Sequence, residues 1–150
     1  MPAVLREARR EDVPEIVALL ADDAIGAARE GPAADHAYYA AFELIAADQR
    51  NQLLVAEAGG RIVGTLQLTM IPGLSRHGML RAQIEGVRVS SDQRGQGLGG
   101  RMIERAIEVA RGQGCGLVQL TSDKRRPDAV RFYESLGFTA SHEGLKLPLR

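Results

Sequence analysis

A glycine-rich run, RGQGLGG at residues 94–100, constrains the fold of this chain more than any other part of the sequence. It follows an alternating segment, residues 79–91, whose pattern predicts a strand with a bulge at Gly86. It precedes apolar residues that recur at helical spacing from Leu98 to Ala110 and predict an amphipathic helix. Glycines let the chain turn tightly, so that successive backbone N–H groups and the positive end of the helix face an anion. The sequence therefore predicts a strand, a turn and a helix that together bind a phosphate group.

Two known phosphate-binding motifs can be compared with this run. Gly95, Gly97 and Gly100 spell the GxGxxG of dinucleotide-binding folds, and an acidic residue, Asp123, follows further along the chain. However, a hairpin precedes the run and only one further helix and strand pair follows it, whereas the dinucleotide fold needs several more parallel strands. The Walker A motif is excluded because no Lys-Ser or Lys-Thr pair follows the glycines. We therefore expect the turn to hold a pyrophosphate beside a mixed sheet.

The rest of the chain predicts further strands and helices. Residues 4–20 indicate a short strand and then a helix that begins with a capping box between Asp12 and Glu15. A second helix, of about 15 residues, follows a break at Gly31 and Pro32. The remaining expectations are a hairpin at Gly59-Gly60, a helix ended by Gly112 and Gly114, a strand over residues 115–122, a helix from Pro127 to Gly137, and one or two strands in residues 138–150.

Length and composition indicate one ordinary globular domain over residues 1–150. Hydrophobic residues make up 45% of the chain and charged residues 25%, and no apolar stretch approaches the roughly 18 residues that span a membrane. The 19 basic and 19 acidic residues balance, which argues against nucleic-acid binding because that needs a basic surface. No basic and apolar leader follows Met1. We therefore expect a cytoplasmic protein with no membrane or nucleic-acid partner.

The cysteine content limits the chemistry of the chain. Cys115 is the single cysteine, so an intramolecular disulfide and a metal site built on cysteine pairs are excluded. Its setting, GQGCGLVQL, favours a small core residue over a catalytic thiol. We expect no metal.

Two motifs together resemble those of the GNAT acetyltransferase superfamily. Residues 94–99, RGQGLG, match its Q/R-x-x-G-x-G/A motif, and RFYESLGF at residues 131–138 resembles its second signature near the C-terminus. Their order is also similar, with one helix and one strand between them, and the resemblance covers nearly the whole chain. It implies an α/β (α+β) fold of the acyl-CoA N-acyltransferase type, with a central mixed, mostly antiparallel sheet of six to seven strands and about four flanking helices.

The resemblance also implies a co-substrate, acetyl-CoA, held where two neighbouring parallel strands splay apart. The backbone of Val87, Arg88 and Val89 is then expected to pair with the pantetheine amides. Arg94 and Arg101 lie at the edge of the turn and are expected to add charge-assisted hydrogen bonds. The pyrophosphate is expected on the turn itself, formed by Arg94, Gly95, Gln96, Gly97, Leu98, Gly99 and Gly100.

One position departs from the pattern of the family. Where many members carry an asparagine that contacts pantetheine, this chain has Arg126. Together with Lys124 and Arg125, Arg126 is expected to meet the 3′-phosphate of the cofactor or an acidic acceptor, or to be solvated. These three possibilities stay open, and Arg126 is assigned to the cofactor site by its position.

Acetyl transfer to an amine needs a nucleophile without its proton and a proton for the departing thiolate. Tyr133 matches the tyrosine that protonates the coenzyme A sulfur in many members, and a phenol with a pKa near 10 suits this role. Glu85, just before the expected bulge, is the candidate general base or amine anchor. Gln83 stands where a base is found in some members, and His77 and His142 are further candidates for the base.

The residues and the resemblance together imply an N-acetyltransferase that acts on a primary amine of an unidentified, small-molecule acceptor. Two competing functions are a protein-amine acetyltransferase and a non-catalytic acyl-CoA-binding regulatory module, and the presence of Tyr133 counts against the second. The C-terminal strands of this superfamily often join subunits, so a homodimer is expected. The acceptor, the acyl-chain preference and the general base stay open.

Overall fold

The computed structural model describes residues 2–150 and divides the chain into two compact units, Met1–Gln119 and Leu120–Arg150. The first unit contains a five-stranded sheet, and the second contains one helix followed by an extended C-terminal segment. The sequence-based expectation of one domain over residues 1–150 stays a prediction. None of the helices described is both long and apolar enough to cross a membrane.

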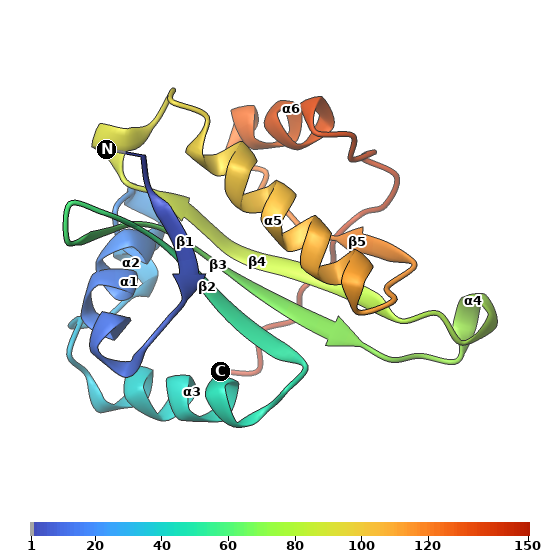
Figure 1. Ribbon diagram of the computed structural model, residues 1–150, viewed down its shortest axis with the longest axis horizontal. Helices are drawn as coiled ribbons and strands as arrows, with labels where there is room; N and C mark the ends of the chain where they lie inside the picture. Colours follow the sequence, from blue (N-terminus) through green and yellow to red (C-terminus); the bar gives the residue numbers. More distant parts are fainter. Residues whose placement is uncertain (1) are drawn as a thin grey trace. The chain divides into compact units, whose positions relative to one another are not determined.

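The sheet is mixed and mostly antiparallel, as predicted (Figure 1). Its order follows the sequence, and each neighbouring pair is antiparallel except the last, which is parallel. The glycine pair Gly59-Gly60 forms the predicted hairpin turn, because both residues have positive φ angles of 58° and 76°. The strands are β1 (Val4–Glu7), β2 (Asn51–Ala58), β3 (Arg61–Ile71), β4 (Arg81–Val89) and β5 (Leu117–Gln119).

The expected count of six to seven strands is wrong for the residues described, which contain five. The difference lies at the C-terminus, where residues 138–150 form no strand. Leu145, Leu147 and Leu149 alternate as in a strand, but their exposed fractions are 92%, 83% and 92%. Alternation predicts a strand only when one face is buried, and here neither face is.

Helices are more numerous than the four or so expected, because short ones occur between the main elements. The second main helix begins after Gly31 and Pro32 as predicted, but it has 12 residues rather than about 15. The α-helices are α1 (Val13–Leu20), α2 (Ala24–Arg29), α3 (His36–Ala47), α4 (Ser75–Gly78), α5 (Leu98–Gly112) and α6 (Pro127–Ser135), with 3-10 turns at Arg10–Asp12 and Ser91–Gln93.

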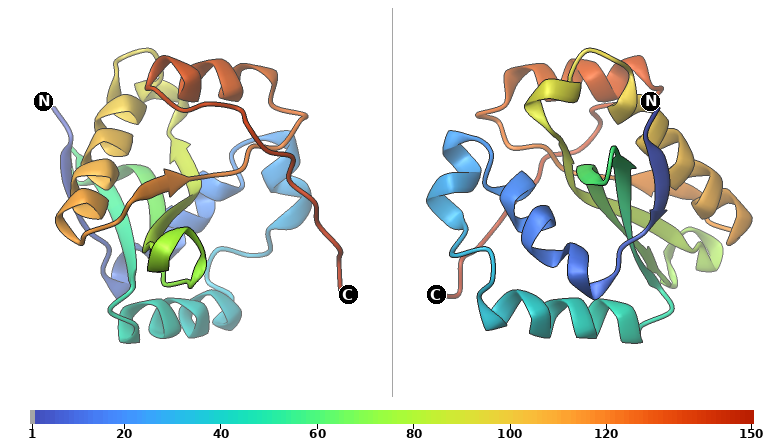
Figure 2. Two further views of the ribbon diagram at one scale, coloured as in Figure 1. Left: turned by 90° about the vertical axis from the view of Figure 1, so that its right-hand side faces the viewer. Right: turned by 60° about the vertical axis from the view of Figure 1, so that its left-hand side comes forward.

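In the first unit, α1 and α5 cover opposite faces of the sheet, as both views of Figure 2 show. Val55 packs in a cluster with Ile16 and Leu19 of α1. Its neighbour Ala56 faces the other way and lies beside Gly64, where a Cβ would stand only 2.6 Å from the sulfur of Met102 in α5. Adjacent residues of a strand point to opposite faces, so the core forms two layers.

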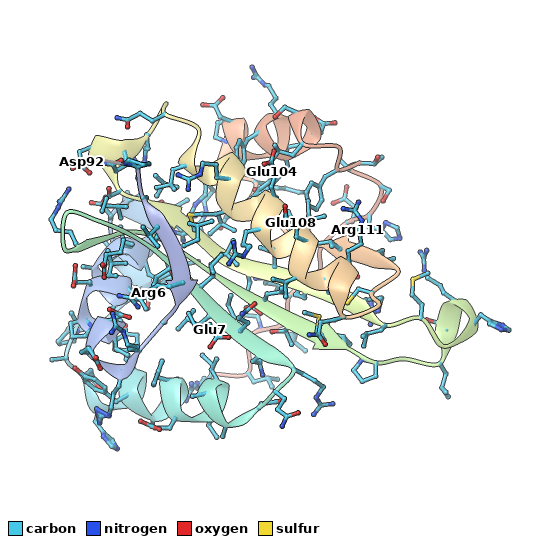
Figure 3. All side chains as sticks on the ribbon, in the orientation of Figure 1. Arg6, Glu7, Asp92, Glu104, Glu108 and Arg111 are labelled. Carbon is cyan, nitrogen blue, oxygen red and sulfur yellow. The ribbon has the colours of Figure 1, made fainter. Side chains whose placement is uncertain are left out.

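Helix α5 is amphipathic, as its sequence predicts. Glu104, Glu108 and Arg111 project outward along its exposed side (Figure 3). The helix ends in a Schellman motif, in which Gly114 has a φ of 85° and the Cys115 N–H donates to the Ala110 carbonyl at 3.0 Å. The buried side is formed by Leu98, Met102, Ile103, Ala106 and Ala110.

The start of α1 differs from the predicted capping box. Asp12 does not cap α1 with its side chain; it accepts a hydrogen bond from the Arg9 backbone N–H at 2.7 Å and two more from Arg6. Glu15 instead accepts from the Ile62 backbone N–H at 2.9 Å. Both carboxylates therefore join α1 to neighbouring elements, because their sheet partners compete with the local cap.

Candidate active site

Strand β4 contains the predicted bulge. Thr65 pairs with Arg88 and Gln67 pairs with Glu85, so the one residue between them on β3 faces two residues on β4. Gly86 lies at this point with a φ of 64°, a conformation that favours glycine. The bulge reverses which backbone groups of β4 face β3 over the residues that follow.

The parallel pairing between β4 and β5 is short. It runs from Arg81 opposite Leu117 to Gln83 opposite Gln119, where β5 ends. Strand β4 continues to Val89, and no other strand of the described chain pairs with residues 84–89 on the β5 side. This stretch therefore has an open edge with backbone groups available to a ligand, as expected for a cofactor that pairs with β4.

Two carbonyl groups on this stretch accept hydrogen bonds from arginine side chains. The Val87 carbonyl accepts from Arg88 Nη1 at 2.8 Å, and the Val89 carbonyl accepts from Arg94 Nε at 3.2 Å. A ligand amide that pairs with these carbonyls must exchange with the two guanidinium groups. This role of the two arginines could not be predicted from the sequence, because nothing in the pattern shows where a flexible side chain folds back.

The glycine run forms an exposed turn directly after β4. Gly95 and Gly97 both have a φ of 80°, and Gly97 is the N-cap of α5. The first helical hydrogen bond runs from the Arg101 N–H to the Gly97 carbonyl at 3.1 Å. The N–H groups of Leu98 and its two successors therefore have no acceptor within the helix and point out of its positive end. The geometry of an anion site is present, with Gly99 in the first turn of the helix rather than in the loop.

The two arginines expected at the edge of the turn have different positions. Arg94 is exposed and also lies 3.9 Å from Asp22 Oδ2, so a phosphate would compete with a weak ion pair. Arg101 is already engaged, because its Nη2 donates to the Ala3 carbonyl at 2.9 Å. Arg101 thus ties the residue before β1 to α5, and the expectation that it contacts the phosphate has no support in this geometry.

The candidate bases lie at different ends of β4 and in different units. Glu85 is exposed beside the bulge, opposite Gln67, and Gln83 is half-buried two residues earlier, opposite Thr69. His77 lies in α4, before the start of β4 and at the end remote from the glycine turn (Figure 1). His142 lies in the second unit, with its Nδ1 2.7 Å from Ser141 Oγ. Glu85 and Gln83 are therefore the candidates that share a strand with the expected cofactor edge.

The second sequence signature folds into a helix end with a hydrophobic contact. Gly137 has a φ of 101°, and the Phe138 N–H donates to the Tyr133 carbonyl at 3.1 Å, which completes a Schellman motif after α6. The rings of Tyr133 and Phe138 meet edge to face at 5.8 Å, and Phe132 lies 5.1 Å on another side. The signature therefore has a structural role, which is to hold Tyr133 at a defined helix end.

The family model for the acetyltransferase (GNAT) family matches residues 4–138. This chain is a member of the GNAT family. The match spans both units and includes the bulged strand, the glycine turn and the second signature. The resemblance inferred from the two motifs is confirmed, and so is the fold class.

Curated relatives of this GNAT chain include two enzymes named for one substrate. Glucosamine 6-phosphate N-acetyltransferase of Trypanosoma brucei brucei is 39% identical over 90 residues, which are 60% of this chain and 59% of that protein. Glucosamine 6-phosphate N-acetyltransferase 1 of Oryza sativa subsp. japonica is 34% identical over 110 residues, 71% of this chain and 65% of that protein. The chain thus spans less than two thirds of the length of these relatives.

Two solved structures match this chain over nearly all of its length. A transcriptional regulator from Bacillus halodurans C-125 is 50% identical with a TM-score of 0.95, covering 98% of this chain and 99% of that one. A putative acetyltransferase from Agrobacterium tumefaciens is 29% identical with a TM-score of 0.86, covering 97% and 99%.

The basic cluster of this GNAT chain is partly engaged within the second unit. Arg125 donates to both carboxylate oxygens of Asp123, at 3.0 and 2.7 Å, and holds the pKa of that carboxyl far below its usual range. Lys124 lies 3.5 Å from Glu143 at the surface. Arg126 is the half-buried N-cap residue of α6. Its expected cofactor contact stays a prediction.

Cys115 is half-buried rather than fully buried. Its Sγ lies 3.3 Å from the sulfur of Met70, and burial raises the pKa of the thiol. The thiol is therefore less ionised at neutral pH than a free cysteine, which agrees with a packing role. The described residues contain no group of three or more side chains suited to hold a metal ion.

Proposed function

We propose that this protein transfers the acetyl group of acetyl-CoA to a primary amine of a small molecule. The observation that carries the proposal is the continuity of one strand, β4, which has an open edge over residues 84–89 and leads directly into an exposed anion-binding turn. Membership of the GNAT family supports it. Relatives named glucosamine 6-phosphate and aminoalkylphosphonate N-acetyltransferase support a small-molecule acceptor rather than a protein one.

The cofactor site that we propose uses backbone more than side chains. Val87, Arg88 and Val89 would pair with the pantetheine amides, because the Val87 and Val89 carbonyls turn away from β3 and already accept N–H donors. The pyrophosphate would lie on the N–H groups of residues 95–100, with Arg94 moving from the Val89 carbonyl toward it. Arg126 is proposed at the 3′-phosphate. Acetyl-CoA would supply the thioester that is attacked.

The proposed chemistry needs two side chains. Glu85 would take the proton of the acceptor ammonium or anchor it, because a carboxylate stabilises a nearby cation and accepts its proton. A bond then forms between the neutral amine nitrogen and the acetyl carbon, the carbon–sulfur bond breaks, and the nitrogen loses a second proton to solvent. Tyr133 would donate its phenol proton to the departing thiolate and regain one from solvent. The products are the N-acetyl amine and free coenzyme A.

Thiol release from acetyl-CoA tests this proposal against a panel of primary amines. We expect turnover with at least one small amine, and a fall in kcat of about 100-fold for Tyr133→Phe and about tenfold for Glu85→Gln. Tyr39→Phe, a tyrosine of α3 outside the proposed site, is the matched control and should keep wild-type kcat. Unchanged kcat in Tyr133→Phe would remove the assigned acid, and failure to bind acetyl-CoA would remove the whole proposal.

A second candidate function is a non-catalytic acyl-CoA-binding regulatory module. The observation that favours it is the 50% identity to a protein described as a transcriptional regulator. The two functions differ in one measurement. A regulatory module binds acetyl-CoA in calorimetry but releases no thiol with any amine, whereas the enzyme does both.

We also propose a homodimer and keep the expected cytoplasmic location as a prediction. The exposed leucines of the C-terminal segment, Leu145, Leu147 and Leu149, support self-association because a surface rarely leaves three alternating leucines to water.

A further inference from the structure

A row of uncharged polar side chains crosses the sheet beside Glu85. The strand register places Asn51 of β2 opposite Thr69, Thr69 opposite Gln83 of β4, and Gln83 opposite Gln119 of β5. Each of four adjacent strands thus contributes one amide or hydroxyl at the same level. All four side chains are half-buried.

The row lies on the face of the sheet that α1 covers further along. In β2, Asn51 points to the same face as Leu53 and Val55, which pack against the α1 cluster. On the opposite face at this level lie buried aliphatic residues, Leu68 of β3 and Ile84 of β4 among them. A sheet covered by helices on both faces is normally apolar on both, so the row needs a reason other than packing.

Hydrogen bonds hold the row in place without using all of its capacity. Thr69 Oγ1 donates to Asn51 Oδ1 at 2.7 Å, and Gln119 Nε2 donates to Gln83 Oε1 at 2.8 Å. Arg81 Nη1 donates to Gln119 Oε1 at 3.2 Å. Asn51 is the most engaged member of the row, because its Oδ1 also accepts from Gln67 Nε2 at 3.4 Å and its side chain hydrogen-bonds Asp48. The capacity for a ligand therefore lies mainly in the second N–H donors of Gln83 and Gln119 and the lone pairs of the Thr69 hydroxyl.

The adjacent level of the sheet brings a carboxylate to the row. Gln67 lies opposite both Leu53 and Glu85, so Glu85 is two residues from Gln83 on the same face. An ammonium group at Glu85 would place the rest of an acceptor over Gln83, Thr69 and Gln119. Two cations lie on this face of β4, and both have hydrogen-bond acceptors within the protein. Arg81 binds Gln119, and Arg88, beyond the bulge, donates to the Val87 carbonyl. The row therefore suits neutral polar groups better than a second charge.

We propose that this row, Asn51, Thr69, Gln83 and Gln119, recognises the hydroxyl groups of the acceptor, which is a primary amine of the amino polyol class. The proposal rests on the proposed acetyl transfer and specifies its substrate. Hydroxyl groups fit because each both donates and accepts, as the row does. A site built to bind hydroxyls discriminates strongly against an analogue that lacks them, because its own polar groups are then left unpaired.

The test uses two probes, D-glucosamine and cyclohexylamine, which share a six-membered ring but differ in hydroxyl groups. Thiol release from acetyl-CoA gives kcat/KM for each probe and hence their ratio. The variants are Thr69→Val and Gln83→Met, which keep side-chain volume. The ratio is kcat/KM for glucosamine divided by kcat/KM for cyclohexylamine. We expect each variant to lower this ratio about tenfold, mostly by raising the KM for glucosamine, because one hydroxyl contact is lost. The different basicities of the two amines cancel when variant and wild-type ratios are compared.

Gln52→Met is the matched control. Gln52 is the neighbour of Asn51 in β2 but points to the opposite face, where its Nε2 donates to Glu7 Oε1 at 2.9 Å. It should leave the ratio unchanged. Calorimetric binding of glucosamine to the protein with coenzyme A gives a second readout, which should weaken in Gln83→Met and not in Gln52→Met.

These results separate this proposal from the proposed function. If acetyl-CoA turns over but neither row variant changes the ratio, or cyclohexylamine is a substrate and glucosamine neither reacts nor binds, the row does not recognise hydroxyls. If no amine reacts, catalysis fails, and the row is then judged by calorimetry alone. The proposal is supported if the wild type binds glucosamine and Gln83→Met weakens that binding. The proposal is overturned if the wild type does not bind glucosamine.

Discussion

At the scale of single residues, Arg6 joins three elements of the first unit. Its guanidinium donates to both carboxylate oxygens of Asp12, at 2.7 and 3.0 Å, and to Glu57 at 2.8 Å. Asp12 is buried, and the Arg6 hydrogen bonds hold the pKa of its carboxyl below the usual range because they stabilise the charged form. The link between β1 and the start of α1 therefore depends on an ionised Asp12.

We expect Asp12→Asn to lower the free energy of unfolding at neutral pH by about 2 kcal/mol, because the half-buried Arg6 cation loses its two-point partner and keeps only Glu57 as a carboxylate partner. The folded-state pKa of Asp12 is depressed, so the stability it confers is present above the unfolded pKa, near 3.9. That stability is lost as the pH falls through the folded pKa. Urea denaturation of variant and wild type from neutral pH to about pH 3 measures both effects.

Asp92→Asn is the control for this prediction. The pKa of Asp92 is also lowered, by hydrogen bonds from Ser90 and Arg61, but the side chain is exposed at the surface. Its variant should unfold much like the wild type. An Asp12→Asn variant as stable as the wild type at neutral pH would refute the role given to the buried pair.

At the scale of elements, the site depends on how β4 ends. The bulge at Gly86 turns the Val87 and Val89 carbonyls away from β3, and the positive φ angles of Gly95 and Gly97 lead the chain into α5. In a regular strand without the bulge, the Val87 and Val89 carbonyls would face β3 and would not lie on the open edge. The bulge and the glycine turn therefore together set which backbone groups the end of β4 and the start of α5 leave open.

We expect Gly97→Ala to destabilise the protein by about 1 to 2 kcal/mol and to weaken coenzyme A binding about tenfold, because alanine disfavours a φ of 80° and the N-cap must shift. Gly112→Ala is the matched control. Gly112 is in the last turn of α5, and a Cβ there meets no atom within 4 Å. Its variant should be as stable as the wild type or more stable.

Thermal unfolding and calorimetry with coenzyme A measure these two effects. Equal affinity for coenzyme A in Gly97→Ala and Gly112→Ala would mean that the turn does not hold the pyrophosphate.

At the scale of the whole molecule, the C-terminal segment presents apolar side chains without a sheet partner in the described chain. Leu145, Leu147 and Leu149 have the alternation of a strand but stay exposed. Chains that expose an alternating apolar segment commonly pair it with another chain. Self-association would complete the strand that the sequence predicts and the structure of one chain lacks.

We expect the wild type to sediment at twice the monomer mass and the triple variant Leu145→Ser, Leu147→Ser, Leu149→Ser to sediment as a monomer, because the variant removes the apolar contact. Leu74→Ser is the control, since Leu74 is 97% exposed but lies in the loop after β3. Sedimentation equilibrium over a concentration series measures both masses. A wild type that stays monomeric at all concentrations, or a triple variant that stays dimeric, would reject the homodimer.

Local patterns in the sequence predicted most of the first unit. The Gly59-Gly60 hairpin, the bulge at Gly86 and the end of α5 at Gly114 all depend on glycine at a positive φ, a preference that acts within a few residues. The two signatures identified the family because each encodes a local geometry, a glycine turn at a helix N-terminus in one and a capped helix C-terminus in the other.

Other features depend on partners distant in sequence. Asp12 and Glu15 have the spacing of a capping box, but Arg6 and Ile62 take both carboxylates. The C-terminal leucines alternate, but only a partner strand could make that a sheet. Arg101 stands beside the phosphate turn in sequence, yet it binds Ala3 across the unit.

The sequence by itself determined the family, the glycine turn before α5 and the type of most elements, because these follow from backbone preferences and periodicity over short ranges. Only the tertiary structure decided which side chains share a face and which backbone groups stay open. The polar row of Asn51, Thr69, Gln83 and Gln119 comes from four separate segments, and strand register alone brings them to one level. Register is set by burial and turns summed over the whole sheet, so no single segment contains it.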